Sequence, residues 1–328
     1  PEDLLIAHRR RLVGYVSRIG AMALTLGACA GEQKSLPSPG AGDGVREMVE
    51  LQGRPVRVAT AGLANRTPGE PVVVLESGLG EDIWGWDGIL TEVAKFTPVV
   101  AYERAGFGLS AWDSIVPSPQ HANRRLRELL QILKVDPPYV LVGHSWGGVL
   151  IHYFAGAYPD EVVGLVYLDP TDVRESPSDM IRVAERIGAS AELLIGGEWD
   201  TASLARLPRP VYAEWRGMRA LLDSPIHARR VPDPPNVPTV VINARDTSND
   251  ILPGSLADLL GEERARDYLC AMWELRMERM HALVPKGAYG SVIVANSAGH
   301  FVHHDSPELV IDVIRSVVAE SQGRSSAR

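Results

Sequence analysis

The chain has 328 residues, of which 45% are hydrophobic and 23% are charged, an ordinary balance for a globular protein with a large core. Its formal net charge is −8 and it has no long basic block, which argues against a nucleic acid partner. Two cysteines, Cys29 and Cys270, are too few for a disulfide framework, and no cysteine–histidine cluster has zinc-site spacing.

The N-terminal segment combines basic and apolar residues. Arg9–Arg11 precede an apolar run, Ile19–Ala28, which is too short to span a bilayer but has the length of a signal-peptide core. The run ends in Leu26-Gly27-Ala28-Cys29, which resembles a bacterial lipobox. We therefore expect residues 1–29 to be a signal peptide, with lipidation at Cys29, export, and membrane attachment through that anchor alone. The alternative is a cytoplasmic protein with a basic tail.

The segment 30–46 is rich in Gly, Pro and Ser and predicts a flexible linker. Strands are expected in eight runs that follow: Glu47–Leu51, Val56–Thr60, Pro71–Glu76, Thr97–Tyr102, Tyr139–Val142, Val162–Asp169, Thr239–Asn243 and Ser291–Ala295. Helices are expected between several of them: Trp86–Ala94, Pro119–Leu133, Gly148–Ala157 and Pro307–Ala319.

This alternation of strands and helices predicts an α/β fold with a doubly wound, mostly parallel sheet of about eight strands. The sheet domain should comprise residues 47–169 and 236–328. Between its two parts, residues 170–235 contain no buried strand run and are longer than an ordinary connection. We expect them to form an inserted helical cap.

Ser145 lies where an expected strand gives way to an expected helix, with Gly143 and Gly147 two residues on either side. This is the G-x-S-x-G pattern of a nucleophile elbow, in which a tight turn presents the serine at the edge of the sheet. The glycines prevent Cβ clashes with the neighbouring strand and helix. His144 should point away from Ser145 and support the turn.

A serine nucleophile needs a base and a carboxylate that orients the base. His300 follows the last expected strand and is the preferred base, with His303 and His304 as rivals closer to the final helix. For the acid we prefer Asp246, at the end of the next-to-last strand. Asp169, before the cap, is the second choice and Asp250 is the third.

An oxyanion formed at Ser145 needs two backbone N–H donors. One is expected from Trp146, directly after the serine, and the other from Leu79, or alternatively Gly78, in the loop after the third strand. In the cap, the large apolar residues Trp199, Trp215 and Met218 are candidates for substrate binding.

With these residues in place, the chain resembles the α/β-hydrolase fold superfamily, and within it the capped single-serine esterase-like enzymes. The resemblance covers about residues 47–320 and is carried by Glu76–Gly80, Tyr102–Ser110, Gly143–Gly148, Asp246 and Gly299–Phe301. Two departures stand out. Ser77 replaces the usual histidine of the oxyanion loop, and Glu103 replaces the aspartate before Arg104, where we interpret the Glu103–Arg104 pair as structural.

The resemblance implies a serine hydrolase that cleaves a small-molecule ester, lactone or thioester through an acyl-enzyme on Ser145, without a cofactor or metal. Two alternatives remain. A peptidase of the proline iminopeptidase kind would need acidic cap groups for a substrate amine, such as Glu185, Glu192, Glu198 and Asp200. A non-catalytic ligand-binding protein could keep the same fold.

Overall fold

The structure is a computed structural model that describes residues 44–189, 207–244, 260–287 and 289–325. The predicted signal peptide, the lipid anchor at Cys29 and most of the predicted linker lie outside these ranges and stay predictions. Strand β1 begins at Val45, so it takes the last two residues that the linker was expected to contain. Within the described ranges, no helix is long and apolar enough to cross a bilayer.

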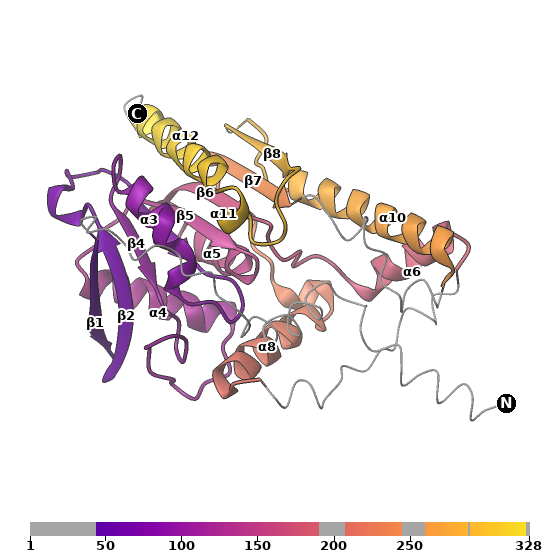
Figure 1. Ribbon diagram of the computed structural model, residues 1–328, viewed down its shortest axis with the longest axis horizontal. Helices are drawn as coiled ribbons and strands as arrows, with labels where there is room; N and C mark the ends of the chain where they lie inside the picture. The colour runs from indigo at the N-terminus through magenta and orange to yellow at the C-terminus, as the bar shows by residue number, and fades with distance from the viewer. Residues whose placement is uncertain (1–43, 190–206, 245–259, 288, 326–328) are drawn as a thin grey trace. The chain divides into compact units, whose positions relative to one another are not determined.

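Eight strands form one sheet in the order β1-β2-β4-β3-β5-β6-β7-β8 (Figure 1). The strands are β1 Val45–Leu51, β2 Arg54–Ala61, β3 Val72–Glu76, β4 Val99–Tyr102, β5 Tyr139–His144, β6 Val162–Leu168, β7 Thr239–Ala244 and β8 Gly290–Ala295. Strands β1 and β2 are antiparallel to their neighbours, and all pairs from β4 to β8 are parallel. This confirms the predicted α/β fold with a mostly parallel sheet.

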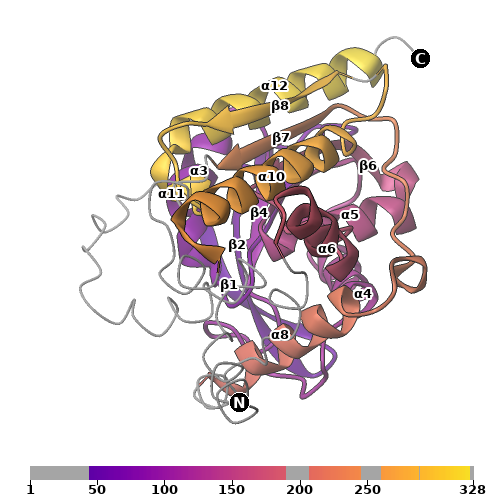
Figure 2. The same ribbon diagram turned by 90° about the vertical axis from the view of Figure 1, so that its right-hand side faces the viewer.

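Helices cover both faces of the sheet. The α-helices are α3 Asp87–Val93, α4 Pro119–Ile132, α5 Trp146–Ala157, α6 Pro177–Arg186, α8 Arg209–Leu222, α10 Glu262–His281, α11 Val302–Asp305 and α12 Pro307–Ser325. Short 3-10 helices are η1 Leu63–Asn65, η2 Ile83–Trp86, η3 Pro159–Glu161 and η5 Ile226–Arg229. Figure 2 shows α12 running along the side of the sheet that carries β7 and β8.

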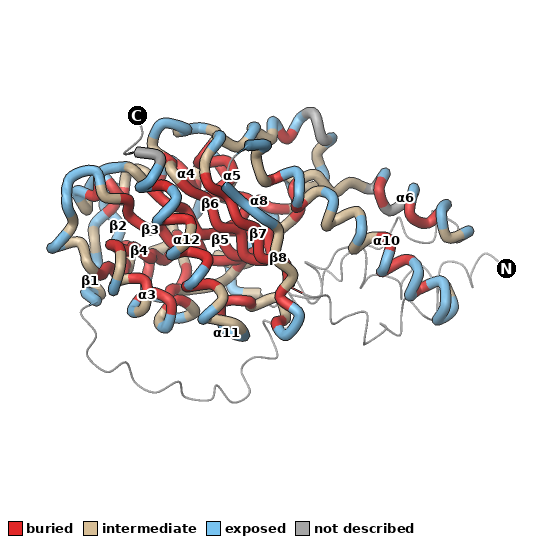
Figure 3. Tube along the Cα trace, turned by 90° about the horizontal axis from the view of Figure 1, so that it is seen from above, coloured by how far each residue is buried: buried red, intermediate tan, exposed pale blue. Residues whose placement is uncertain are grey.

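Two apolar layers enclose the sheet, as Figure 3 shows by the buried strands between the helices. One layer packs side chains of α3, α11 and α12 against the sheet, and it includes Trp86, Val302 and Ile314. The opposite layer packs α4 and α5, with Leu126 and Phe154, against the other face. Strand β3 is buried at every position, as its unbroken Val-Val-Val-Leu-Glu run predicts for an interior parallel strand.

The described residues divide into two compact units, and the sheet unit comprises 44–174, 213–244 and 279–325. The smaller unit comprises 175–189, 207–212 and 260–278. In it, Val183 and Ala184 of α6 form an apolar cluster with Ala265, Tyr268 and Leu269 of α10. A capping box of Ser176 and Asp179 starts α6.

These units differ from the predicted cap, residues 170–235, in two places. Residues 213–235 belong to the sheet unit, and residues 260–278, expected in the sheet domain, belong to the smaller unit. The first difference has a local cause in α8. Its Glu214 pairs with Arg104, and a Cβ on Gly217 would lie 1.9 Å from the carbonyl oxygen of Pro117. This close packing ties the second half of α8 to the sheet unit.

Candidate active site

Ser145 occupies the sharp turn that joins β5 to α5. Its backbone has φ 51° and ψ −116°, a strained conformation for a residue with a side chain. Hydrogen bonds hold the turn: the Ser145 N–H donates to the carbonyl of Leu168 at 3.0 Å, and the Ser145 carbonyl accepts from Gly148 and from Thr171, each at 3.0 Å. The strand–turn–helix geometry of the nucleophile elbow is therefore present.

The flanking glycines are required by close backbone packing. A Cβ on Gly143 would lie 2.5 Å from the carbonyl oxygen of Gly147, and a Cβ on Gly147 would lie 2.3 Å from that of Glu76. Backbone atoms cannot give way as a flexible side chain can. The elbow therefore packs directly against the end of β3, where the loop 77–82 begins.

His300 lies in the loop between β8 and α11 and pairs with Asp169. Its Nδ1 lies 2.6 Å from Oδ2 of Asp169, and Oδ1 of Asp169 accepts the N–H of Ala244 at 3.1 Å. The other ring nitrogen, Nε2, is buried and makes no hydrogen bond to the part of the chain that the structure describes. This is an imidazole oriented by a carboxylate on one side and available on the other.

The acid at His300 is thus Asp169, which sequence reasoning ranked second. The preferred residue, Asp246, lies outside the described residues, as does Asp250. Asp169 directly follows β6, which lies between β5 and β7 in the sheet. Since Leu168 is level with His144 on one side and with Ile242 on the other, the end of β6 adjoins the elbow directly. The chain order of the motif could not reveal this, because both candidates follow Ser145 and precede His300.

The rival histidines have other surroundings. His303 is buried and stacks on the ring of Trp86, with centroids 4.6 Å apart. Burial and the nearby charge of His144 lower its pKa well below the usual value. His304 is also on α11, and its pKa is lowered, chiefly by burial. Asp169, directly after β6, pairs with His300 and with neither His303 nor His304.

The loop after β3 offers one backbone donor beside the elbow. The Gly78 N–H donates to Oε2 of Glu81 at 2.7 Å, and the Gly80 N–H donates to Oε2 of Glu214 at 3.1 Å. Between them, the Leu79 N–H meets no acceptor among the described residues, and the same holds for the Trp146 N–H at the start of α5. Of the two amides proposed from sequence in this loop, that of Gly78 is hydrogen-bonded to Glu81. That of Leu79 has no acceptor among the described residues.

A buried arginine fixes the backbone of that loop. The Arg104 guanidinium donates to the carbonyls of Ser77 and Gly78, at 2.7 and 2.6 Å, and forms ion pairs with Glu76 and Glu214. Burial alone would lower the pKa of Arg104, but the two carboxylates raise it, so the guanidinium stays charged. Arg104 is therefore structural, although its partners differ from the expected Glu103.

Glu103 instead accepts the Leu109 N–H at 2.6 Å and lies 3.7 Å from Arg57. A Cβ on Gly108 would lie 2.2 Å from the Glu103 carboxylate. Ser77, at the position where a histidine was expected, accepts the indole N–H of Trp86 at 2.9 Å. Both departures from the family pattern thus have partners that hold the loops in place.

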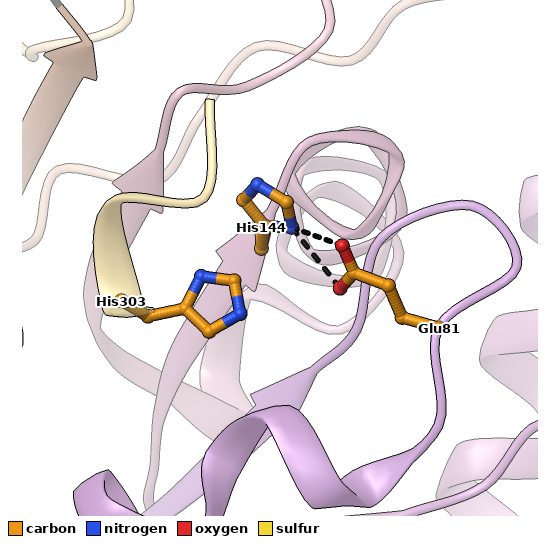
Figure 4. A group of neighbouring side chains, drawn as sticks. All are labelled: Glu81, His144 and His303. Atoms are coloured by element: carbon orange, nitrogen blue, oxygen red, sulfur yellow. Dashed lines mark hydrogen bonds and ion pairs between the residues drawn. The ribbon is translucent and has the colours of Figure 1, made fainter. Parts of the chain in front are cut away.

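His144 and Glu81 form a second imidazole–carboxylate pair (Figure 4), and the His144 ring lies 4.7 Å from that of His300 between centroids. Nδ1 of His144 lies 3.0 Å from Oε2 and 2.8 Å from Oε1 of Glu81. Potential metal-ligand atoms of Glu81, His144 and His303 lie within 4.8 Å of one another, the one such group found in the described part of the chain. Sequence reasoning gave His144 a supporting role but assigned none to Glu81, which carries no motif.

Two of the three proposed substrate-binding residues lie in the described part of the chain. Met218 is fully buried and Trp215 is 8% exposed, both in the part of α8 that belongs to the sheet unit. Trp199 lies outside the described residues. A small pocket beside the start of α5 is lined by other residues, including Gly148, His152, Tyr167, Pro170, Arg174 and Arg279.

Curated relatives match parts of the chain. The uncharacterized protein YqjL of Bacillus subtilis (strain 168) is 30% identical over 98 residues, which are 30% of this chain and 39% of YqjL. The (lyso)-N-acylphosphatidylethanolamine lipase of Bos taurus is 26% identical over 160 residues, 44% of this chain and 46% of the lipase. Each match spans less than half of the relative's own length.

Solved structures share the fold over most of the chain. A putative lipase from Acinetobacter baumannii AYE has a TM-score of 0.55 at 15% identity, and the match covers 86% of this chain and 93% of the lipase. The sequence model of the alpha/beta hydrolase family matches residues 72–313, which include the elbow, Asp169 and His300. With this match and the eight-stranded sheet, the chain belongs to the alpha/beta hydrolase family.

Proposed function

We propose that the protein is a serine hydrolase that cleaves a carboxylic ester, lactone or thioester through an acyl-enzyme on Ser145. One observation carries the proposal. His300 has Nδ1 held by Asp169 and a buried Nε2 without a hydrogen-bond partner in the described structure, at the same sheet edge as the strained Ser145. A base of this kind is what a serine nucleophile requires.

In the first half-reaction, Nε2 of His300 takes the Ser145 hydroxyl proton as Oγ attacks the substrate carbonyl carbon. Asp169 keeps the remaining proton on Nδ1 and stabilises the imidazolium that forms. The tetrahedral intermediate collapses when the bond to the leaving oxygen or sulfur breaks, and His300 gives its proton to the leaving group. Water, activated by the same base, then attacks the acyl-enzyme and releases the acid and free Ser145.

The N–H groups of Leu79 and Trp146 are the donors we assign to the oxyanion. Both lack acceptors among the described residues, whereas the Gly78 N–H is engaged by Glu81. Trp146 also begins α5, so the positive end of the helix dipole adds to the stabilisation of a developing negative charge. Arg104 fixes the carbonyls on the other side of the loop and so keeps its amides oriented.

The relatives support the reaction class. The bovine relative is named a lipase, and the Mycobacterium tuberculosis protein Lipase LipV is 40% identical over 73 residues, 27% of its own length. These matches include only parts of each chain, so the substrate of this protein is open within the acyl class.

The test is turnover of a panel by the purified full chain, with nitrophenyl esters of increasing acyl length, lactones, a thioester and an aminoacyl nitroanilide. We expect hydrolysis of at least one ester, lactone or thioester, and stoichiometric labelling of Ser145 by a fluorophosphonate, both lost in Ser145→Ala. Hydrolysis of the nitroanilide alone would replace the proposal with a peptidase. No turnover and no labelling would favour a binding protein.

A further inference from the structure

Both ring nitrogens of His144 lie within hydrogen-bond distance of acceptor oxygens. Its Nε2 lies 2.8 Å from the backbone carbonyl oxygen of His300, which can only accept, so Nε2 carries a proton. Its Nδ1 faces the carboxylate of Glu81 at 2.8 and 3.0 Å. One proton must lie between these two groups, on Nδ1 of His144 or on Glu81.

The surroundings place this proton on His144. The Gly78 N–H donates to Glu81 at 2.7 Å, which favours an ionised carboxylate. Burial on its own would raise the pKa of Glu81, but His144 and this amide lower it to about 2. Burial would likewise lower the pKa of His144, but Glu81 raises it. The pair is therefore an imidazolium and a carboxylate.

This ion pair connects three separate parts of the site. His144 is the residue before Ser145, so its backbone belongs to the elbow. Nε2 holds the carbonyl of His300, which anchors the loop that carries the base. Glu81 accepts the Gly78 N–H, while the N–H of the next residue, Leu79, meets no acceptor among the described residues. Nucleophile, base and oxyanion donor are thereby fixed to one buried side chain, since His144 has no exposed surface.

His303 closes the remaining side of the pair. Its ring lies beside that of His144 (Figure 4), with the centroids 4.5 Å apart. The His303 ring also stacks on Trp86. His303 is 3% exposed, and its Nδ1 makes no hydrogen bond within the described ranges. A neutral ring here excludes water without competing for Glu81, which strengthens the ion pair. A metal ion would instead have to displace the His144 proton and share a carboxylate that already has two donors.

We propose that Glu81 and His144 are a positioning pair of the site, in which a doubly protonated His144 sets the distance between the His300 loop, the Ser145 elbow and the Leu79 amide. The expected effect on turnover rests on the proposed function. The charge state of His144 is independent of that function. Because small displacements of reacting groups cost up to about 100-fold in rate, loss of the pair should lower kcat by about 10- to 100-fold.

Three variants test the two hydrogen-bonded contacts of His144, one with Glu81 and one with the His300 carbonyl. Glu81→Gln keeps the shape but removes the charge that holds the His144 proton. His144→Gln can keep a donor near the position of Nε2, and His144→Asn can keep one near Nδ1. We expect a lower kcat with a KM within about threefold of wild type in each. His121→Asn is the matched control, because Nε2 of His121, on α4, lies 3.0 Å from Asp113, in the segment before that helix, in a similar pair. It should change neither parameter.

The pH profile gives a readout that a merely structural role would not change. The titratable groups that face His144 are Glu81, His303, His300 and Asp169. In Glu81→Gln, His144 should lose its proton at lower pH, so the alkaline fall in kcat should move to lower pH while Asp169 and His300 are unchanged. An unchanged alkaline limb together with a wild-type kcat would overturn the proposal.

Nitrogen NMR of the full chain with isotope-labelled histidines tests the charge state of His144 without any substrate. The His144 signals are assigned by their loss in His144→Gln. We expect both nitrogens of His144 to be protonated at pH 7 in wild type and one of them in Glu81→Gln. A neutral His144 in wild type would overturn the inference even if the enzyme turns over esters. Stoichiometric zinc binding that is lost in both Glu81→Gln and His303→Phe would also overturn it, in favour of a metal centre.

Discussion

Two imidazole–carboxylate pairs lie side by side at the same edge of the sheet, and their rings are 4.7 Å apart between centroids. In the first, Asp169 holds Nδ1 of His300 and Nε2 is left without a partner in the described structure. In the second, Glu81 holds Nδ1 of His144 and a backbone carbonyl takes Nε2. Only His300 has a nitrogen left to accept a proton.

This difference shows that the residue types alone do not define a catalytic base. His300 is 31% exposed at its side chain, whereas His144 is fully buried and both of its ring nitrogens face acceptor oxygens. In the proposed mechanism the base is the histidine whose second nitrogen has no partner among the described residues, and we infer that the other histidine is held as a cation by both of its bonds. The predictions below test this contrast.

Replacement of the nucleophile should have the largest effect. Ser145→Ala removes the group that gives the free Nε2 its function, and we expect kcat to fall by about 10⁶-fold, the cost of losing the serine in a serine protease. The measurement is ester turnover at saturating substrate, with the Tm as a check on folding. A variant that keeps half of the wild-type rate would mean that His300 serves another nucleophile.

Asp169→Asn should lower kcat by about 10⁴-fold, because an amide at this position favours the wrong tautomer of His300. Asp246→Asn is the matched control, since Asp246 is the acid that the sequence favoured from its place after the next-to-last strand, and it should cost less than about tenfold. The two kcat values on one ester decide between them. The reverse ranking would return the acid to the end of β7.

Gly147→Ala should disturb both pairs through the backbone of the elbow. The added Cβ would meet the Glu76 carbonyl at 2.3 Å, so the loop after β3 must move. We expect a loss of about 3 kcal/mol in the free energy of unfolding, together with a lower kcat. Urea denaturation measures the first quantity. Gly88→Ala in α3 is the control: no atom lies within 4 Å of its Cβ, and it should be neutral or stabilising by up to about 1 kcal/mol.

His152 offers a third histidine, with no carboxylate on either nitrogen. Its ring contacts the Tyr167 hydroxyl at 3.0 Å and the Pro232 carbonyl at 2.9 Å, and burial lowers its pKa to about 4. The unfolded state therefore binds a proton first as the pH falls. The contribution of neutral, buried His152 to the free energy of unfolding is complete above the ordinary histidine pKa of about 6.5. It is lost as the pH falls towards 4.

His152→Gln should therefore reduce the fall in unfolding free energy between pH 7 and pH 5 by about 2 kcal/mol relative to wild type. Urea denaturation of both proteins at the two pH values gives this difference. The contributions of groups that titrate equally in both proteins cancel. The same slope in both proteins would show that folding does not lower the pKa of His152.

The sequence by itself determined the features that depend on neighbouring residues. Runs of β-branched residues separated by amphipathic stretches predict an alternating α/β sheet, and the elbow is recognisable because Gly143, Ser145 and Gly147 lie within five residues. His300 could be proposed because the last strand and the last helix leave one short loop between them.

The tertiary structure decided what depends on residues far apart in the chain. The acid at His300 comes from β6, because β6 is the neighbour of β5 in the sheet, and no motif encodes which strand end adjoins the elbow. Glu81 and His144 are 63 residues apart and meet only when β3 and β5 pair. The second half of α8 joins the sheet unit through Glu214 and Arg104, 110 residues apart. Spacing and periodicity report local geometry, whereas these partners are selected by packing between elements that the chain connects only through long segments.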